Sequence, residues 1–131
     1  MSLTQEQALR AYATMMNTLD AAHLAPLLAE DFRYSSQWVL ATIGSKAEFL
    51  DYITPKLETL RNAGAVVWAE MGWLDHENPG PCVVMAQGGK DNLVAVVLAG
   101  VADGKIARLD MCGVPPPPHV RRSGEYPGRA G

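Results

Sequence analysis

The stretch from residue 65 to residue 113 constrains this chain most, because its hydrophobic residues follow a period of two and many are β-branched. Such runs predict β-strands. Four of them are separated by turn-like Gly, Pro, Asn and Asp, and they cover residues 65–75, 81–88, 92–102 and 105–112. Asp103-Gly104 between the last two is a strong hairpin signal. Because such short connections join strands of opposite direction, this half of the chain predicts an antiparallel sheet.

The first half of the chain has helical periodicity instead. Residues 4–19 place apolar side chains at helical spacing and begin with a capping box. A shorter helix is predicted over residues 21–31. A third begins after Ser45, bends at Pro55 and stops near residues 62–64. Helices that are separate from an antiparallel sheet indicate an α+β fold in which the helices cover one face.

Length and composition suit one domain. The chain has 131 residues, of which 48% are hydrophobic and 19% charged. We expect a single domain over residues 1–113, followed by a Pro/Gly-rich tail over residues 114–131. The tail is expected to run as polyproline and then coil, on the surface or against a partner chain.

Charge and hydropathy exclude several classes of partner. A net charge of −3 argues against nucleic acid, which needs a concentrated basic surface. No apolar run reaches membrane-spanning length and no signal-peptide pattern opens the chain, so we expect a cytoplasmic protein with no membrane partner. We expect Cys82 and Cys112 to be buried free thiols rather than a disulfide. Residues 75–78 group acids with a histidine in one turn, but no second ligand cluster accompanies them, so no metal or cofactor is predicted.

A further strand is predicted within residues 30–49, between the second and third helices. Side chains alternate along a strand, which places Phe32, Tyr34, Ser36 and Trp38 on one face. That face is the more apolar and should point inward, yet it carries a phenol, a hydroxyl and an indole N–H that need partners when buried. An apolar cavity with a few polar groups is the usual form of a small-molecule site. Plain core packing by Tyr34 and Trp38 is the alternative.

Three features together resemble the nuclear transport factor 2-like superfamily, in its SnoaL-like and ketosteroid-isomerase-like branches. They are the order of the elements, the passage "LLAEDFRYSSQWV…GSKAEFLDYI" and the hairpin "ADGKIARLD". The resemblance covers residues 4 to about 113. It implies a cystatin-like half-barrel, in which a cone-shaped, curved antiparallel sheet wraps around three N-terminal helices and leaves a pocket. It also implies a homodimer through the outer face of the sheet. The run 92–102, apolar on both faces, favours the same dimer.

The last strand offers one candidate catalytic acid. Asp110 lies between Leu109 and Met111, and burial in the cone would raise its pKa and suit it to proton transfer. SnoaL-like cyclases are similar in using an acid near the end of this strand. The family's His-Trp-Asp pattern is absent, however, and "RLD" stands in its place. An exposed ion pair between Asp110 and Arg108 is the alternative.

Two other positions could serve chemistry. Glu70 and Trp68 share one face of an apolar strand, either in the pocket or on the surface. Tyr12 could act as the tyrosine of a ketosteroid-isomerase-like site, but the strand over residues 92–101 contains no acid to accompany it. The residues expected to line the pocket are Tyr12, Met16, Tyr34, Ser36, Trp38, Tyr52, Trp68, Glu70 and Arg108.

The functional expectation is a SnoaL-like protein that binds a small hydrophobic molecule in an apolar pocket. Acid–base chemistry of the cyclase, isomerase, dehydratase or hydrolase type would depend on Asp110. The alternatives are ligand binding without turnover and a homodimeric association domain whose cone is packed by its own side chains. An inward carboxylate would favour catalysis, and an open cavity without a usable acid or base would favour binding.

Overall fold

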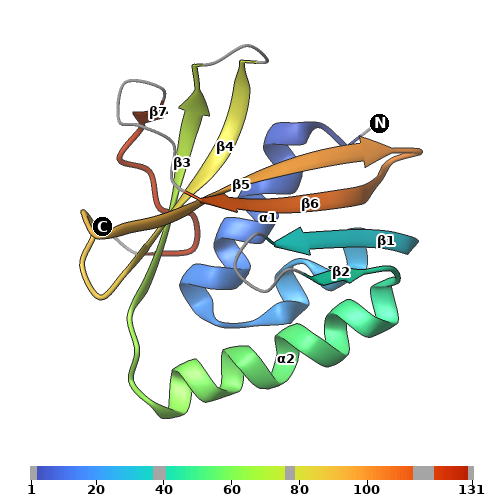
Figure 1. The fold of residues 1–131 in the computed structure, drawn as a ribbon, viewed down its shortest axis with the longest axis horizontal. Helices are drawn as coiled ribbons and strands as arrows, with labels where there is room; N and C mark the ends of the chain where they lie inside the picture. Colours follow the sequence, from blue (N-terminus) through green and yellow to red (C-terminus); the bar gives the residue numbers. More distant parts are fainter. Residues whose placement is uncertain (1–2, 37–40, 76–78, 114–119, 130–131) are drawn as a thin grey trace.

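The computed structural model describes residues 3–36, 41–75, 79–113 and 120–129 (Figure 1). Its α-helices are α1 (Gln5–Thr18) and α2 (Lys46–Asn62). The strands are β1 (Leu28–Ser36), β2 (Ala41–Ile43), β3 (Val67–Leu74), β4 (Gly80–Gln87), β5 (Leu93–Ala102), β6 (Lys105–Gly113) and β7 (Val120–Arg122). They form one seven-stranded sheet in the order β2-β1-β6-β5-β4-β3-β7.

Both long helices begin where the sequence predicts, because their caps are local. Thr4 accepts a hydrogen bond from the Gln7 amide, and the Gln7 side chain accepts one from the Thr4 amide, which completes the capping box of α1. At α2, Ser45 accepts a hydrogen bond from the Glu48 amide. The helix continues through Pro55 and ends at Asn62.

The helix predicted over residues 21–31 is wrong. Two short 3₁₀ turns, Ala21–His23 and Ala25–Leu27, stand in its place, and β1 begins directly after them. Pro26 cannot donate the backbone hydrogen bond that a continuous helix would need there. Leu28 pairs with Ile106 of β6 instead, and after an irregularity Arg33–Ser36 pair with the same strand. The structure therefore has two α-helices and two 3₁₀ turns among its described residues, rather than the three helices predicted.

The four strands predicted after residue 65 are confirmed as β3 to β6, and they pair antiparallel in sequence order. Strand β1 joins the edge of β6 in the parallel direction. The predicted inward face of β1 is also confirmed, because Phe32, Tyr34 and Ser36 are all buried.

A β-bulge in β6 changes which of its residues share a face. Gly100 pairs with Arg108 and Val101 pairs with Ile106, so Ala107 is the extra residue. Strict alternation along β6 would place Ile106 and Arg108 on one face, but the bulge separates them. Ile106 and Leu109 are both buried, while Arg108 is exposed.

The sheet is open and strongly curved. Figure 1 shows β3 and β4 running across the direction of β5 and β6, with α1 packed inside the bend and α2 beside β1. The inner face and the two helices share the main core. A smaller apolar cluster on the outer face contains Cys82, Val84 and Val96. Both cysteines are free, as predicted, with Cys82 buried and Cys112 partly buried. Among the described residues, no helix is long and apolar enough to cross a membrane.

Residues 120–129, the C-terminal segment, return to the sheet. Strand β7 pairs with Gly72–Leu74 of β3, and the backbone amide of Met71 then donates to the Glu125 carbonyl at 2.9 Å. The Asn17 side chain on α1 donates to the Pro127 carbonyl at 2.8 Å. The described part of the tail thus adds a strand and packs on the domain, where the sequence predicted polyproline and coil.

Candidate functional site

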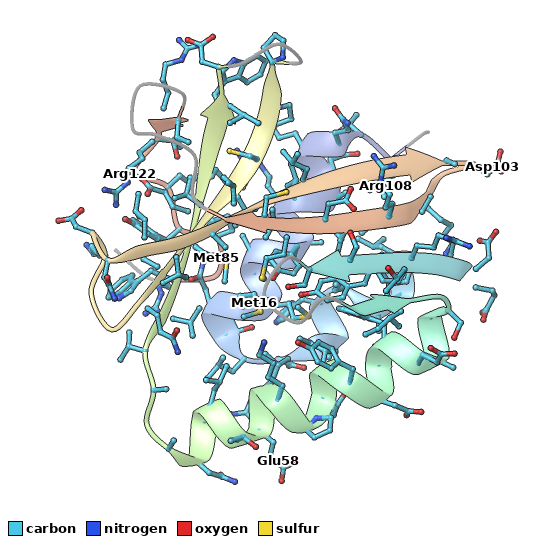
Figure 2. The ribbon with its side chains drawn as sticks, in the orientation of Figure 1. Met16, Glu58, Met85, Asp103, Arg108 and Arg122 are labelled. Carbon is cyan, nitrogen blue, oxygen red and sulfur yellow. The ribbon has the colours of Figure 1, made fainter. Side chains whose placement is uncertain are left out.

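A cavity of about 380 Å³ lies between α2, the end of α1 and the inner face of the sheet. This volume is within the range of small-molecule sites. Figure 2 shows Met16 and Met85 in the space between α2 and the sheet. The cavity is lined by Met16, Ser36, Tyr52, Lys56, Leu60, Val67, Met85, Ala86, Gln87, Val94, Ala95 and Met111.

Most of this lining is apolar. Three methionines, Met16, Met85 and Met111, come from α1, β4 and β6 respectively. Their unbranched side chains adapt to irregular shapes, and their sulfur atoms make favourable contacts with aromatic rings. The pocket is therefore suited to an apolar body without demanding a single shape.

The polar groups of the lining are Ser36, Tyr52, Lys56 and Gln87. Lys56 donates a hydrogen bond to the Tyr52 hydroxyl at 3.2 Å, and its ammonium lies 5.4 Å from the centre of the Tyr52 ring. Lys56 and Gln87 are exposed, and Tyr52 is half-buried, so these three groups form the rim of the pocket. Ser36 is buried. None of the described residues that line the pocket is an Asp or a Glu.

Two more tyrosines lie behind this rim. The Tyr34 ring lies 5.8 Å from the Tyr52 ring, and its hydroxyl donates to the sulfur of Met111 at 3.8 Å. Burial raises the pKa of Tyr34 to about 12, and the nearby Tyr52 adds to this shift. Burial, followed by the charges of Tyr34 and Tyr52, also raises the pKa of Tyr12 well above its ordinary value. These phenols are protonated at neutral pH, so they are hydrogen-bond donors rather than bases.

Asp110 lies on the other side of β6. Its neighbour Met111 lines the pocket, while the Asp110 carboxylate accepts hydrogen bonds from the Ser35 hydroxyl at 2.7 Å and from Arg108 Nε at 2.8 Å. The side chains of Arg108 and Asp110 are 62% and 26% exposed. The structure thus shows the ion pair that sequence reasoning kept as the alternative, and the carboxylate has no contact with the pocket.

Glu70 and Trp68 also face away from the pocket, toward the C-terminal segment. The Glu70 carboxylate accepts hydrogen bonds from Arg122 Nε and from the Gly124 amide, each at 2.7 Å. Its side chain is only 4% exposed. The Trp68 ring packs against the Arg129 guanidinium, 4.0 Å from the ring centre. Both residues hold the C-terminal segment in place.

The structure therefore brings part of the predicted site together. Met16, Ser36 and Tyr52 line the pocket, and Tyr12 and Tyr34 lie behind it. The remaining predicted residues with a described position, Trp68, Glu70, Arg108 and Asp110, lie outside it. Trp38 is outside the described residues.

The sequence analysis did not predict two polar residues of the rim, Lys56 and Gln87. Lys56 is four residues after Tyr52 and four before Leu60, so all three share one face of α2. This spacing was visible in the sequence. Gln87 ends β4, and nothing in the local pattern distinguishes it from an ordinary turn residue. Among the described residues, no group of three or more His, Cys, Asp or Glu side chains could hold a metal ion.

Comparison with known proteins gives a fold but no sequence relative. No protein-family model matches the chain, and no curated protein matches it significantly. A SnoaL-like protein of unknown function from Burkholderia thailandensis aligns with a TM-score of 0.62 and 15% identity, over 88% of this chain and 100% of that one. A putative ketosteroid isomerase from Kribbella flavida aligns with a TM-score of 0.55 and 23% identity, over 97% of this chain and 96% of that one. An NTF2-like protein of unknown function from Cytophaga hutchinsonii aligns with a TM-score of 0.58 and 13% identity. The alignment covers 89% of this chain and 96% of that one.

The chain has the nuclear transport factor 2-like fold. The cone-shaped, cystatin-like α+β architecture predicted from the sequence is confirmed. At these identities the likeness shows the nuclear transport factor 2-like fold alone, and such folds host many unrelated activities. The function must therefore be argued from the residues of this chain.

Proposed function

We propose that this protein binds a small, largely apolar molecule in the pocket between α2 and the sheet. The observation that carries the proposal is the open cavity of about 380 Å³, with apolar residues around it and four polar side chains among those that line it. An enclosed apolar surface with a few polar groups is the common form of a ligand site. A cone packed by its own side chains would leave no such space.

Binding is a better match to this site than acid–base catalysis. A carboxylate that transfers protons must reach the ligand, and Asp110 points to the opposite side of β6. Burial raises the pKa values of Tyr12 and Tyr34 behind the pocket, so these two phenols do not accept protons at neutral pH. The described lining thus offers hydrogen-bond donors and the one amine of Lys56, and no carboxylic acid.

A thermal-shift screen against small terpenoids, aromatic ketones and medium-chain lipids tests the proposal. A ligand at a hundred times its dissociation constant adds about 2.7 kcal/mol to the unfolding free energy. For a chain of this size the melting temperature should rise by roughly 10 °C. Replacing Ala95, a buried lining residue, by Phe would fill the cavity and remove the shift.

Ala102→Phe is the matched control, because Ala102 is exposed at the far end of the same strand. The control should respond to ligand like the parent protein. If no compound in the panel shifts the parent, or if Ala95→Phe responds as well as the parent does, the pocket is not a ligand site.

We also propose that two copies associate through the outer face of the sheet. The support is the outer apolar cluster, beside which Leu93 and Leu98 of β5 remain half-buried in the single chain. A partner sheet would cover these two side chains. Sedimentation at micromolar concentration should give the mass of a dimer, and Leu98→Glu should reduce it to that of a monomer. A parent protein that sediments as a monomer would contradict this proposal.

A further inference from the structure

The rim of the pocket carries a positive charge that no acid in the described part of the chain neutralises. Lys56 is the one charged side chain among the described residues that line the cavity. It forms no ion pair with any residue that the structure describes. Its contacts with the described residues are the hydrogen bond to the Tyr52 hydroxyl and the approach to the Tyr52 ring.

The arrangement of α2 keeps acids away from this ammonium group. On the helix surface the neighbours of Lys56 are three or four residues away, namely Tyr52, Ile53, Thr59 and Leu60. None of these is acidic. Glu58 is nearby in the sequence, but Figure 2 shows it on the face of α2 that points away from the sheet.

Several arginines of this chain are arranged differently. Arg10 pairs with Glu125 at 2.5 Å, Arg108 with Asp110 at 2.8 Å, and Arg122 with Glu70 at 2.7 Å. These cations are partnered within the chain, whereas Lys56 is placed beside an apolar cavity. A cation at such a place complements a negative charge carried by the ligand.

Further donors accompany the lysine. Because the Tyr52 oxygen accepts the hydrogen bond from Lys56, the phenolic O–H remains able to donate. The Gln87 side chain, also in the lining, carries an amide donor. One ammonium with a phenol next to it, and an amide donor elsewhere in the lining, suit a group with one negative charge and two acceptor oxygens. A doubly charged phosphate monoester would need a second cation.

We propose that the ligand is an amphiphilic carboxylate, with its apolar chain or ring among Met16, Met85 and Met111 and its carboxylate at Lys56 and Tyr52. This inference rests on the proposed function and adds the chemical class of the ligand. The apolar body supplies most of the affinity, and the charged rim selects the head group.

Decanoate, decanol and decylamine test the inference, because they share one hydrocarbon chain and differ in head group. Calorimetric titrations at neutral pH and low salt should show decanoate binding about ten-fold more tightly than decanol, as expected for one charge-assisted hydrogen bond. Decylamine should bind most weakly. The preference for decanoate should shrink as salt is added, since the rim is exposed to solvent.

Variants of the rim assign the preference to Lys56. Lys56→Met keeps most of the length of the side chain and removes the charge, so the affinity for decanoate should fall about ten-fold while the affinity for decanol changes much less. Lys56→Arg should retain the preference. Lys46→Met is the matched control, because Lys46 begins the same helix and does not line the pocket.

The outcomes separate this inference from the proposed function. If decanol binds as tightly as decanoate, or decylamine binds best, the pocket is a ligand site and the carboxylate class is wrong. A preference for decanoate that survives in Lys56→Met would also overturn the inference. If none of the three binds and no apolar compound shifts the melting temperature, the proposed function and the inference both fail.

Discussion

The outer edge of β3 and the rim of the pocket differ in whether their polar groups have partners within the chain. Along the edge of β3, most polar groups have partners within the chain, and the buried indole N–H of Trp68 is the exception among the described residues. The Asn17 side chain bonds both the amide and the carbonyl of Ala69, at 2.8 Å each, and Arg129 donates to the Val67 carbonyl. Further along, Met71 pairs with the backbone of Ser123 and Glu125. At the pocket, Lys56 has no acid partner among the described residues.

This difference separates polar groups that hold the fold together from those available to a ligand. An uncovered edge strand is a template for pairing with other chains, and the C-terminal segment removes that hazard at β3. Glu70 takes part by binding Arg122 and the Gly124 amide. The burial of Glu70 in an apolar strand is thus explained by a structural ion pair and a backbone hydrogen bond, without a catalytic role.

The largest predicted effect is at the ion pair of the β3 edge, in which the buried Glu70 meets the exposed Arg122. Glu70→Gln or Arg122→Met each removes one partner of a pair in which the Glu70 side chain is only 4% exposed. Arg122→Met should lower the unfolding free energy by about 2–4 kcal/mol, because the Glu70 carboxylate is left buried with the Gly124 amide as its remaining partner among the described residues. Glu70→Gln should lower it by less, because Arg122 is exposed and keeps its hydrogen bonds to Asp91 and the Lys90 carbonyl. Denaturant unfolding of both single variants and the double variant measures the coupling.

In the same two variants, the affinity for a pocket ligand should match that of the parent protein when measured well below the melting temperature. A large loss of affinity without loss of fold would show that Glu70 serves the ligand site, and the contrast between the two regions would be wrong.

An intermediate effect is predicted for alkaline solution. Burial raises the pKa of Tyr34 to about 12, from 10 in the unfolded chain, and the pKa of Cys82 to about 11. Because the folded state holds these protons more tightly, their stabilising contribution is complete below the unfolded pKa and is lost as the pH rises through the folded pKa. For Tyr34 the loss between about pH 10 and 12 should be about 2 kcal/mol.

Denaturant unfolding across this alkaline range measures that loss, and Tyr34→Phe should flatten the decline. Tyr126 is the matched control, because it belongs to the C-terminal segment and is only half-buried. If Tyr126→Phe flattens the decline as much as Tyr34→Phe does, burial beside the pocket is not its cause.

The smallest effect is predicted for the exposed ion pair on β6. Asp110→Asn and Arg108→Met remove partners that are 26% and 62% exposed. Their coupling in a double-variant cycle should be at most about 1 kcal/mol, since water screens the pair. Ligand affinity should not change in Asp110→Asn. A loss of binding there would return Asp110 to the functional site.

The comparison also shows how far sequence reasoning reached. The capping residues of α1 and α2 and the strands β3 to β6 were predicted, because caps, turns and periodicity act over a few residues. The helix over residues 21–31 failed because the pairing of β1 with β6, which is distant in the sequence, competes with local helix propensity. The bulge at Ala107 has no local signal, and it changed the faces of β6.

The candidate site, like the fold, has features that the local sequence determines and features that depend on contacts between distant residues. The sequence by itself determined an α+β chain whose early strand turns Tyr34 and Ser36 inward, because the alternation of side chains is a local property. Only the tertiary structure decided that Asp110 and Glu70 face away from the cavity while Lys56 reaches its rim. The function of a polar side chain depends on its partners, and folding brings these from distant parts of the chain, as it brings Arg122 to Glu70.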